Sequence, residues 1–184
     1  MSDVDVLEGV LDKGATLIEN VRPEQHGDPT PCPEYDVKTL VFHMVGWLRA
    51  FAEGANGRTF EGDPNAYASD DPAGDFRAAA AECVRGWREH GTDRTVKLSS
   101  MELPAANVLG MTLMEYVTHG LDLARATGQE PPFTDDELAV TYDRAVATLP
   151  DQYRGEGMPF AHAVPVPDDA PVRDRLLGFM GRTP

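Results

Sequence analysis

The chain has 184 residues, of which 31 are Asp or Glu and 16 are Lys or Arg, so its formal net charge is -15. A negative field of this size repels DNA, RNA and anionic membrane surfaces, although a small anionic ligand can still bind in a local pocket. The length suits one domain with a sizeable core, and we predict a single domain over residues 1–184.

Targeting and redox features point to the cytoplasm. Residues 1–5 are acidic where a targeting segment is basic, and no apolar run reaches the roughly 18–20 residues of a membrane span. The two cysteines, Cys32 and Cys83, make no disulfide framework and suit a reducing compartment. We therefore expect a soluble cytoplasmic protein with neither a membrane nor a nucleic acid as partner.

Helical spacing of apolar residues organises the first half of the chain. It predicts one helix over residues 3–21 and a second over residues 37–53, which Asp36 begins as an N-cap. Between them, residues 26–33 contain three prolines, which favour an extended loop. Residues 54–71 read as a long loop of a length that is often functional.

A third helix is predicted from Asp71 and Pro72 to a stop at Gly91. The alternation over residues 94–98 predicts a short strand, for which residues 163–166 are the candidate partner; Pro165 limits that partner to a sheet edge. Cys83, in the third helix, is interpreted as a small core residue.

The second half of the chain begins with a helix from near Asn107 to a stop at Gly128. Thr134 and Glu137 form a capping box for a fifth helix, which Pro150 ends. We expect the inward stripe of that helix to be Leu138, Tyr142, Val146 and Leu149. A loop over residues 155–167 and a final helix over residues 171–180 follow.

Four helices of about 15–20 residues with polar outer faces predict an all-α fold. The architecture we expect is a four-helix bundle with appended short helices and, at most, a minor two-stranded hairpin. The bundle matters for function because side chains of its neighbouring helices can meet in one interior site.

Glu115 and His119 lie four residues apart in the fourth helix, one turn apart on the same side. That side borders the apolar face, which consists of Leu113, Tyr116, Val117, Gly120, Leu121 and Ala124. A carboxylate and an imidazole at this spacing can bind one metal ion, or they can hydrogen-bond to each other at the edge of a core. A further ligand is needed to decide between these readings.

His43 offers that ligand, since it lies at the edge of the apolar face of the second helix, one turn before Trp47. A lone histidine there is more often a core residue than a ligand. With Glu115 and His119, however, it completes a three-ligand set. Zinc held by three protein ligands keeps one position open for water or substrate, and an open zinc binds a thiol as thiolate.

Several other residues stay open as contributors. Asp122, near His119, either orients a ligand or is a solvated helix residue. Cys32 either approaches the metal or reacts as a thiol, or it is a packed loop residue. His162 can replace or supplement a ligand from the late loop. The loop or helix-end positions of His26 and His90 favour solvated side chains.

Three segments resemble a known family. Residues 30–37 and 40–46 resemble the N-terminal motif of the mycothiol-dependent maleylpyruvate isomerase-like proteins of the DinB-like superfamily, and residues 115–128 resemble the second motif. Residues 163–167 and 175–182 resemble the end of an actinobacterial metal-binding subfamily. Tyr35 and Leu121 stand where the family pattern has Trp.

The resemblance implies a four-helix bundle with a divalent metal, zinc or alternatively nickel, at His43, Glu115 and His119. It also implies mycothiol as co-substrate in a thiol-dependent transferase or isomerase, acting on an electrophilic small molecule, and a homodimer. About 35 residues follow the fifth helix, whereas the isomerase has a separate C-terminal domain that contributes to its site, so a transferase fits better than maleylpyruvate isomerisation. The alternative is a non-catalytic metal- or ligand-binding bundle with a stress-related or sequestration role.

Overall fold

The computed structural model describes residues 2–98, 101–158 and 160–184. Six α-helices and one two-stranded sheet lie in these ranges. The helices are α1 (Asp3–Glu19), α2 (Val37–Ala55), α3 (Pro72–His90), α4 (Ala105–Thr127), α5 (Asp135–Thr148) and α6 (Val172–Phe179). The strands are β1 (Thr95–Leu98) and β2 (Met101–Pro104), and short 3-10 helices lie at η1 (Pro23–Gln25), η2 (Pro64–Ala66) and η3 (Asp151–Tyr153).

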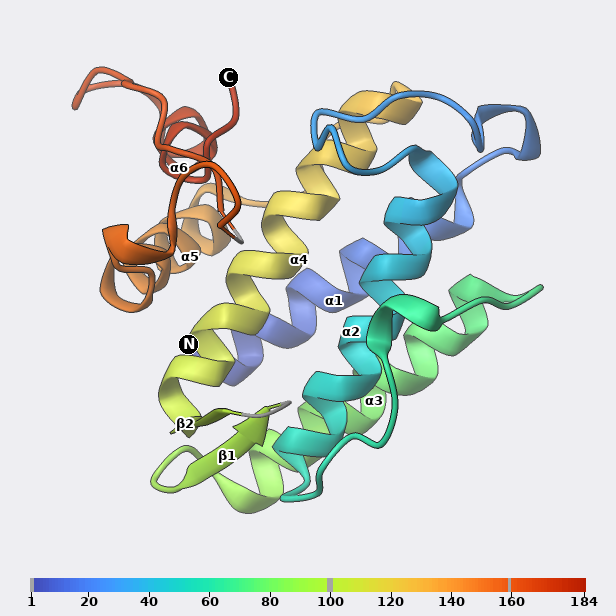
Figure 1. The fold of residues 1–184 in the computed structure, drawn as a ribbon, viewed down its shortest axis with the longest axis vertical. Coiled ribbons are helices and arrows are strands. Elements are labelled where there is room, and N and C mark those ends of the chain that lie inside the picture. Colours follow the sequence, from blue (N-terminus) through green and yellow to red (C-terminus); the bar gives the residue numbers. More distant parts are fainter. Residues whose placement is uncertain (1, 99–100, 159) are drawn as a thin grey trace.

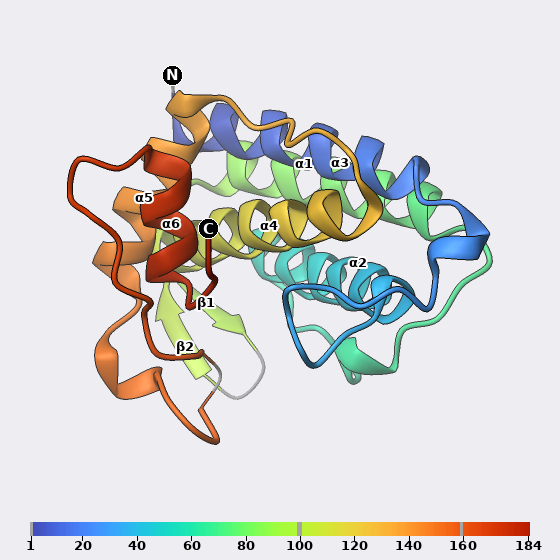
Figure 2. The same cartoon turned by 90° about the horizontal axis from the view of Figure 1, so that it is seen from above.

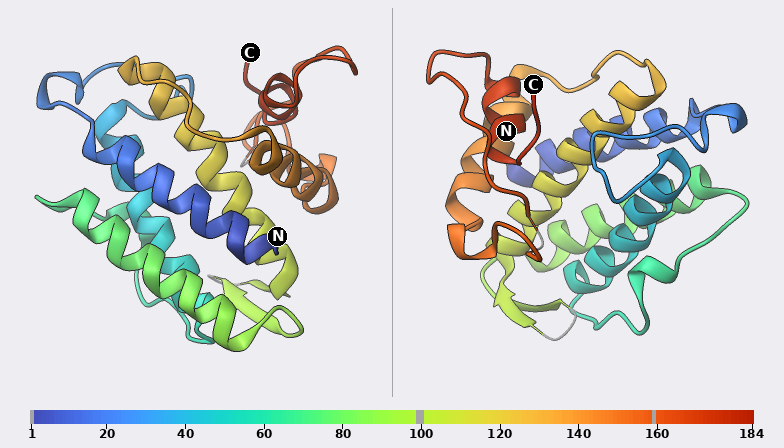
Figure 3. Two further views of the ribbon diagram at one scale, coloured as in Figure 1. Left: turned by 180° about the vertical axis from the view of Figure 1, so that it is seen from behind. Right: turned by 45° about the horizontal axis from the view of Figure 1, so that its top comes forward.

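The four long helices α1 to α4 form a bundle, which Figure 1 shows from the front and Figure 3 from behind. Both α1 and α2 pack against α3 and against α4. The rings of Phe51 and Phe76 meet Tyr116 edge to face in the interior. The Tyr116 hydroxyl donates a hydrogen bond of 3.0 Å to the Met44 carbonyl, so this buried polar group is satisfied. The predicted mostly helical bundle is confirmed.

Helices α5 and α6 lie outside the bundle, on the side of α4, as Figure 2 shows from above. Helix α5 packs against α4, and α6 packs against α5. Arg154, just after η3, stacks its guanidinium 4.2 Å from the Phe179 ring centroid and donates to the Phe179 carbonyl at 2.7 Å. Arg154 thereby joins the segment after η3 to the end of α6.

The minor hairpin is present, but the predicted partner strand was wrong. β1 pairs antiparallel with β2, the next segment of the chain, and not with residues 163–166. A short connection closes at a smaller entropic cost than one of some sixty residues. Val164 instead donates its backbone N–H to Gly178 at 2.8 Å, and Pro165 has no N–H to donate.

Some predicted boundaries and faces also shift. Helix α1 ends at Glu19 and α4 begins at Ala105, each two residues from the expected limit. Val146, predicted to face inward, is 52% exposed, because α5 packs through Leu138, Thr141 and Ala145. In the described ranges, no helix combines the length and apolarity needed to cross a bilayer.

Candidate metal centre

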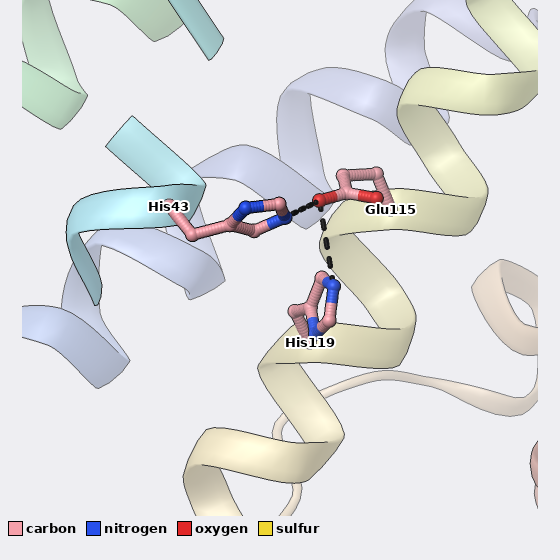
Figure 4. Close-up of side chains that lie close together, drawn as sticks. All are labelled: His43, Glu115 and His119. Carbon is pink, nitrogen blue, oxygen red and sulfur yellow. Dashed lines mark hydrogen bonds and ion pairs between the residues drawn. The ribbon is translucent and has the colours of Figure 1, made fainter. Parts of the chain in front are cut away.

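The structure brings His43, Glu115 and His119 together between α2 and α4 (Figure 4). The Oε1 atom of Glu115 lies 2.8 Å from His43 Nε2 and 3.5 Å from His119 Nε2. One donor atom from each residue lies within 4.8 Å of the others. In the described residues, His, Cys, Asp and Glu side chains form one cluster of three or more possible metal ligands, and it is this group.

Helix pairing produces this arrangement. Glu115 and His119 are one turn apart on α4, and His43 lies on the facing surface of α2. The hydrogen bond from Tyr116 to the Met44 carbonyl joins the residues next to Glu115 and His43 in the chain. It therefore sets the register of the two helices at the level of the site.

The donor set and its spacing suit a divalent ion. Two imidazole nitrogens and a carboxylate oxygen are ordinary zinc ligands, and ligand atoms on a tetrahedral zinc lie roughly 3.4 Å apart. The three side chains are largely buried yet retain 13% (His43), 20% (Glu115) and 10% (His119) of their exposure. The group therefore keeps a limited exposure to solvent.

The charges within the group support one another. Burial opposes ionisation of Glu115, but the nearby His119 and the hydrogen bond to His43 outweigh it and lower the pKa of Glu115. Burial also opposes protonation of His119, but Glu115 and Asp122 outweigh it and raise the pKa of His119. Without a metal, the group is a carboxylate that attracts positive charge, whether carried by a proton or by a metal ion.

Tyr35 belongs to the site, although the sequence marked it only as a departure from the family pattern. Its hydroxyl lies 3.0 Å from His43 Nδ1. Burial, with Glu34 nearby, raises the pKa of Tyr35 to about 12, so the hydroxyl stays protonated at neutral pH. When His43 Nδ1–H donates to this oxygen, Nε2 keeps its lone pair for a ligand.

The loop before α2 places Tyr35. The Thr30 hydroxyl is within hydrogen-bonding distance, as donor, of the Cys32 and Tyr35 carbonyls, at 2.9 and 2.8 Å. Val37 N–H donates to the Asp28 carbonyl at 3.0 Å. Asp36 caps α2 as predicted, accepting from Thr39 N–H at 2.8 Å.

Asp122 is not solvated, so the interpretation as a solvated helix residue was wrong. Its side chain is 1% exposed, and its Oδ2 lies 3.2 Å from His119 Nδ1. Arg182, which the sequence showed only as part of a C-terminal motif, reaches the same carboxylate at 2.9 Å. Sixty residues separate Asp122 from Arg182, so no local sequence pattern predicts this ion pair.

The remaining candidates lie outside the group. Cys32 is a buried loop residue; burial raises the pKa of its thiol, and Arg182 nearby opposes this shift. Cys83 is fully buried in the core, as predicted. His26, His90 and His162 are exposed. In the described part of the chain, neither Cys32 nor His162 adds a fourth ligand to the three.

Fold and site together define a helical-bundle protein with a His–Glu–His group suited to a divalent metal. The chain belongs to the family of the mycothiol maleylpyruvate isomerase N-terminal domain, whose model matches residues 7–124. The match contains all three residues of the group, and it confirms the resemblance to the DinB-like, mycothiol-dependent isomerase-like proteins.

Curated relatives extend the similarity beyond that domain. Two uncharacterized proteins of Mycobacterium tuberculosis, from strains CDC 1551 / Oshkosh and H37Rv, are each 36% identical to the chain over 173 residues. The alignments cover 94% of this chain and 93% of each relative. No solved structure matches the chain significantly.

Proposed function

We propose that the protein binds one divalent metal ion, zinc in the first instance, through His43, Glu115 and His119, and uses it in a thiol-dependent transfer reaction. The observation that carries this proposal is the approach of three donor atoms to within 4.8 Å of one another, on side chains that are still partly exposed. The family name adds mycothiol as the candidate thiol.

The chain's own residues would hold and orient the metal. His43 Nε2, Glu115 Oε1 and His119 Nε2 supply the ligand atoms, and Tyr35 and Asp122 bond to the other nitrogens of the two imidazoles. A divalent metal bound here supplies the acidity that converts a thiol to a thiolate near neutral pH.

The reaction class is attack of a low-molecular-weight thiol on an electrophile. The thiol loses its proton, and its sulfur lone pair forms a bond to carbon. In a substitution the leaving group departs with the electron pair of its own bond to that carbon; in an addition the π pair of the electrophile takes up the proton. A divalent metal held by only these three residues would keep a position open for a thiol or water, which supports catalysis over storage. A group closed by Cys32 or His162 would have favoured the sequestration reading, and the described residues form no such group.

The test is thiol conjugation by metal-loaded protein. Mycothiol is mixed with monobromobimane, and bromide release is followed with wild type and with His43→Ala. We expect wild type to accelerate conjugation and His43→Ala to fall to the uncatalysed rate. Equal rates for the two proteins, with mycothiol, bacillithiol and glutathione alike, would leave a non-catalytic metal-binding bundle as the better description.

A further inference from the structure

Asp122 is a buried carboxylate with two partners. Its side chain is 1% exposed; Oδ2 lies 3.2 Å from His119 Nδ1 and 2.9 Å from Arg182 Nη2. A second nitrogen of Arg182, Nε, lies 3.3 Å from both carboxylate oxygens. A carboxylate this deeply buried is stable only when paired and hydrogen-bonded, and Arg182 meets that need as a fork.

Arg182 reaches Asp122 because the chain turns sharply after α6. Gly181 has a φ of 76°, in the left-handed region, and a Cβ there would lie 2.7 Å from the Cβ of Ala161. The turn brings Arg182 N–H to the Leu177 carbonyl at 2.8 Å and Arg182 Nη1 to the Met180 carbonyl at 3.0 Å. The guanidinium is thus held by its own segment and directed at Asp122.

We infer that Asp122 and Arg182 are positioning residues of the candidate metal centre: Arg182 holds the carboxylate of Asp122, and Asp122 holds the proton of His119 on Nδ1. The lone pair of His119 is then on Nε2, the nitrogen that faces Glu115. The inference deepens the proposed function and rests on it for the identity of the bound ion. It makes the C-terminal segment part of the site.

Arg182 lies outside the part of the chain that the family model matches. The match to the family model ends at residue 124, so the matched region includes Asp122 and His119 but not Arg182. The matched residues alone therefore lack the Arg182 guanidinium that pairs with the Asp122 carboxylate. The last helix and the turn after it therefore complete a site whose candidate ligands all lie in the matched region.

Arg182 could instead serve only to fasten the C-terminus to α4. A variant of Arg125 distinguishes this explanation from a positioning role. Arg125 Nη1 donates to the Thr183 carbonyl at 2.9 Å, so it also fastens the last residues to α4, but from an exposed position. Its hydrogen bond does not involve Asp122. Arg125→Gln therefore removes a tether without touching the proposed positioning pair.

The first experiment needs no metal. The tautomer of His119 is read from imidazole ¹⁵N shifts of the metal-free protein at a pH where the ring is neutral. Wild type and Arg125→Gln should show Nδ1–H, whereas Asp122→Asn and Arg182→Gln should show a mixture with Nε2–H. Retention of the wild-type tautomer in both Asp122→Asn and Arg182→Gln would overturn the inference, whether or not the protein binds metal.

The second experiment measures zinc affinity by competition with a chelator. Removal of a residue that orients a metal-bound histidine costs about tenfold to hundredfold in affinity, which we expect for Asp122→Asn and Arg182→Gln. Arg125→Gln should match wild type, and Arg182→Lys, which keeps the charge without the fork, should fall between. Arg182→Gln within about twofold of wild type would also overturn the inference. Absence of zinc binding in wild type would instead refute the proposed function, and the tautomer would still decide the role of the pair.

Discussion

Each of the two histidines has one ring nitrogen toward Glu115 and the other on a partner of its own. His43 Nδ1 meets the Tyr35 hydroxyl at 3.0 Å, and His119 Nδ1 meets Asp122 at 3.2 Å. The partners differ in charge, so His119 lies beside two carboxylates and His43 beside one carboxylate and a neutral phenol. Such partners orient a ligand histidine and raise its basicity, and the site should depend on both.

Tyr35→Phe tests the partner of His43. The substitution removes one hydroxyl and keeps the ring, so we expect zinc affinity to fall about tenfold while the fold is retained. Affinity is measured by chelator competition, and helicity by circular dichroism. Tyr153→Phe is the matched control, because Tyr153 is 45% exposed and far along the chain in η3. Equal affinities of the two variants would remove Tyr35 from the site.

The opposite pKa shifts of Glu115 and His119 predict a pH window for the metal-free protein. The lowered pKa of Glu115 contributes stability above its ordinary value of 4.5, and that stability is lost as pH falls through the folded pKa. The raised pKa of His119 contributes stability below its ordinary value of 6.5, and that stability is lost as pH rises through the folded pKa. Both contributions are therefore present between pH 4.5 and 6.5.

His119→Gln makes this window measurable. In urea unfolding of metal-free protein, the stability lost through the substitution should be greatest between about pH 4.5 and 6.5 and should shrink toward pH 9. A loss that stays constant or grows above pH 6.5 would show that His119 is not held protonated by its neighbours.

The short helix η2 packs closely against α2, the helix that carries His43. A Cβ on Gly46 would lie 1.9 Å from the Pro64 carbonyl oxygen, which is backbone and cannot move as a side chain would. The adjacent Trp47 donates its indole N–H to Asn65 at 3.2 Å. The long loop that the sequence predicted over residues 54–71 is therefore seated on α2 at its centre.

Gly46→Ala should displace η2 and destabilise the protein by about 1–3 kcal/mol, because an added methyl must push backbone away. Gly27→Ala is the control, since nothing lies within 4 Å of a Cβ there, and its effect should stay within about 0.5 kcal/mol. Urea unfolding of the two variants gives the comparison. Equal stability would mean that the segment around Pro64 adapts freely.

The elements that the sequence predicted well are those with a local signal. The capping box of Thr134 and Glu137 is present at the start of α5, and Asp36 caps α2. The partner of β1 was wrong because alternation describes a strand without naming its neighbour, and the nearest segment closes the shorter loop. The predicted inward orientation of Val146 was wrong because the buried face of α5 contains Thr141 and does not contain Val146. A search for apolar residues at helical spacing does not find a buried threonine.

In the whole molecule, the parts of the site with a local sequence signal could likewise be predicted, and the parts that depend on distant contacts could not. The spacing of Glu115 and His119 is local and can be read from the sequence. His43 followed from the expectation that neighbouring helices of a bundle direct side chains into one interior site. Arg182 was not, because its approach to Asp122 depends on where α6 packs and on the turn at Gly181. Contacts between distant segments are set by tertiary packing and leave no periodic trace in the sequence.

The homodimer implied by the family resemblance remains a prediction for the whole molecule. We expect two chains to pair through the faces of their helices. Sedimentation equilibrium at high micromolar concentration should give twice the chain mass of 20.0 kDa. A single 20.0 kDa species at that concentration would contradict it.

Metal binding at His43, Glu115 and His119 is tested most directly by the zinc content of untagged protein after reconstitution and desalting, for wild type, His43→Ala and His162→Ala. His162 is exposed and lies outside the group, so its variant controls for adventitious binding by histidine. We expect about one zinc per chain in wild type and His162→Ala, with helicity retained and zinc lost in His43→Ala. Less than about 0.2 zinc per chain in wild type, or full retention in His43→Ala, would contradict it.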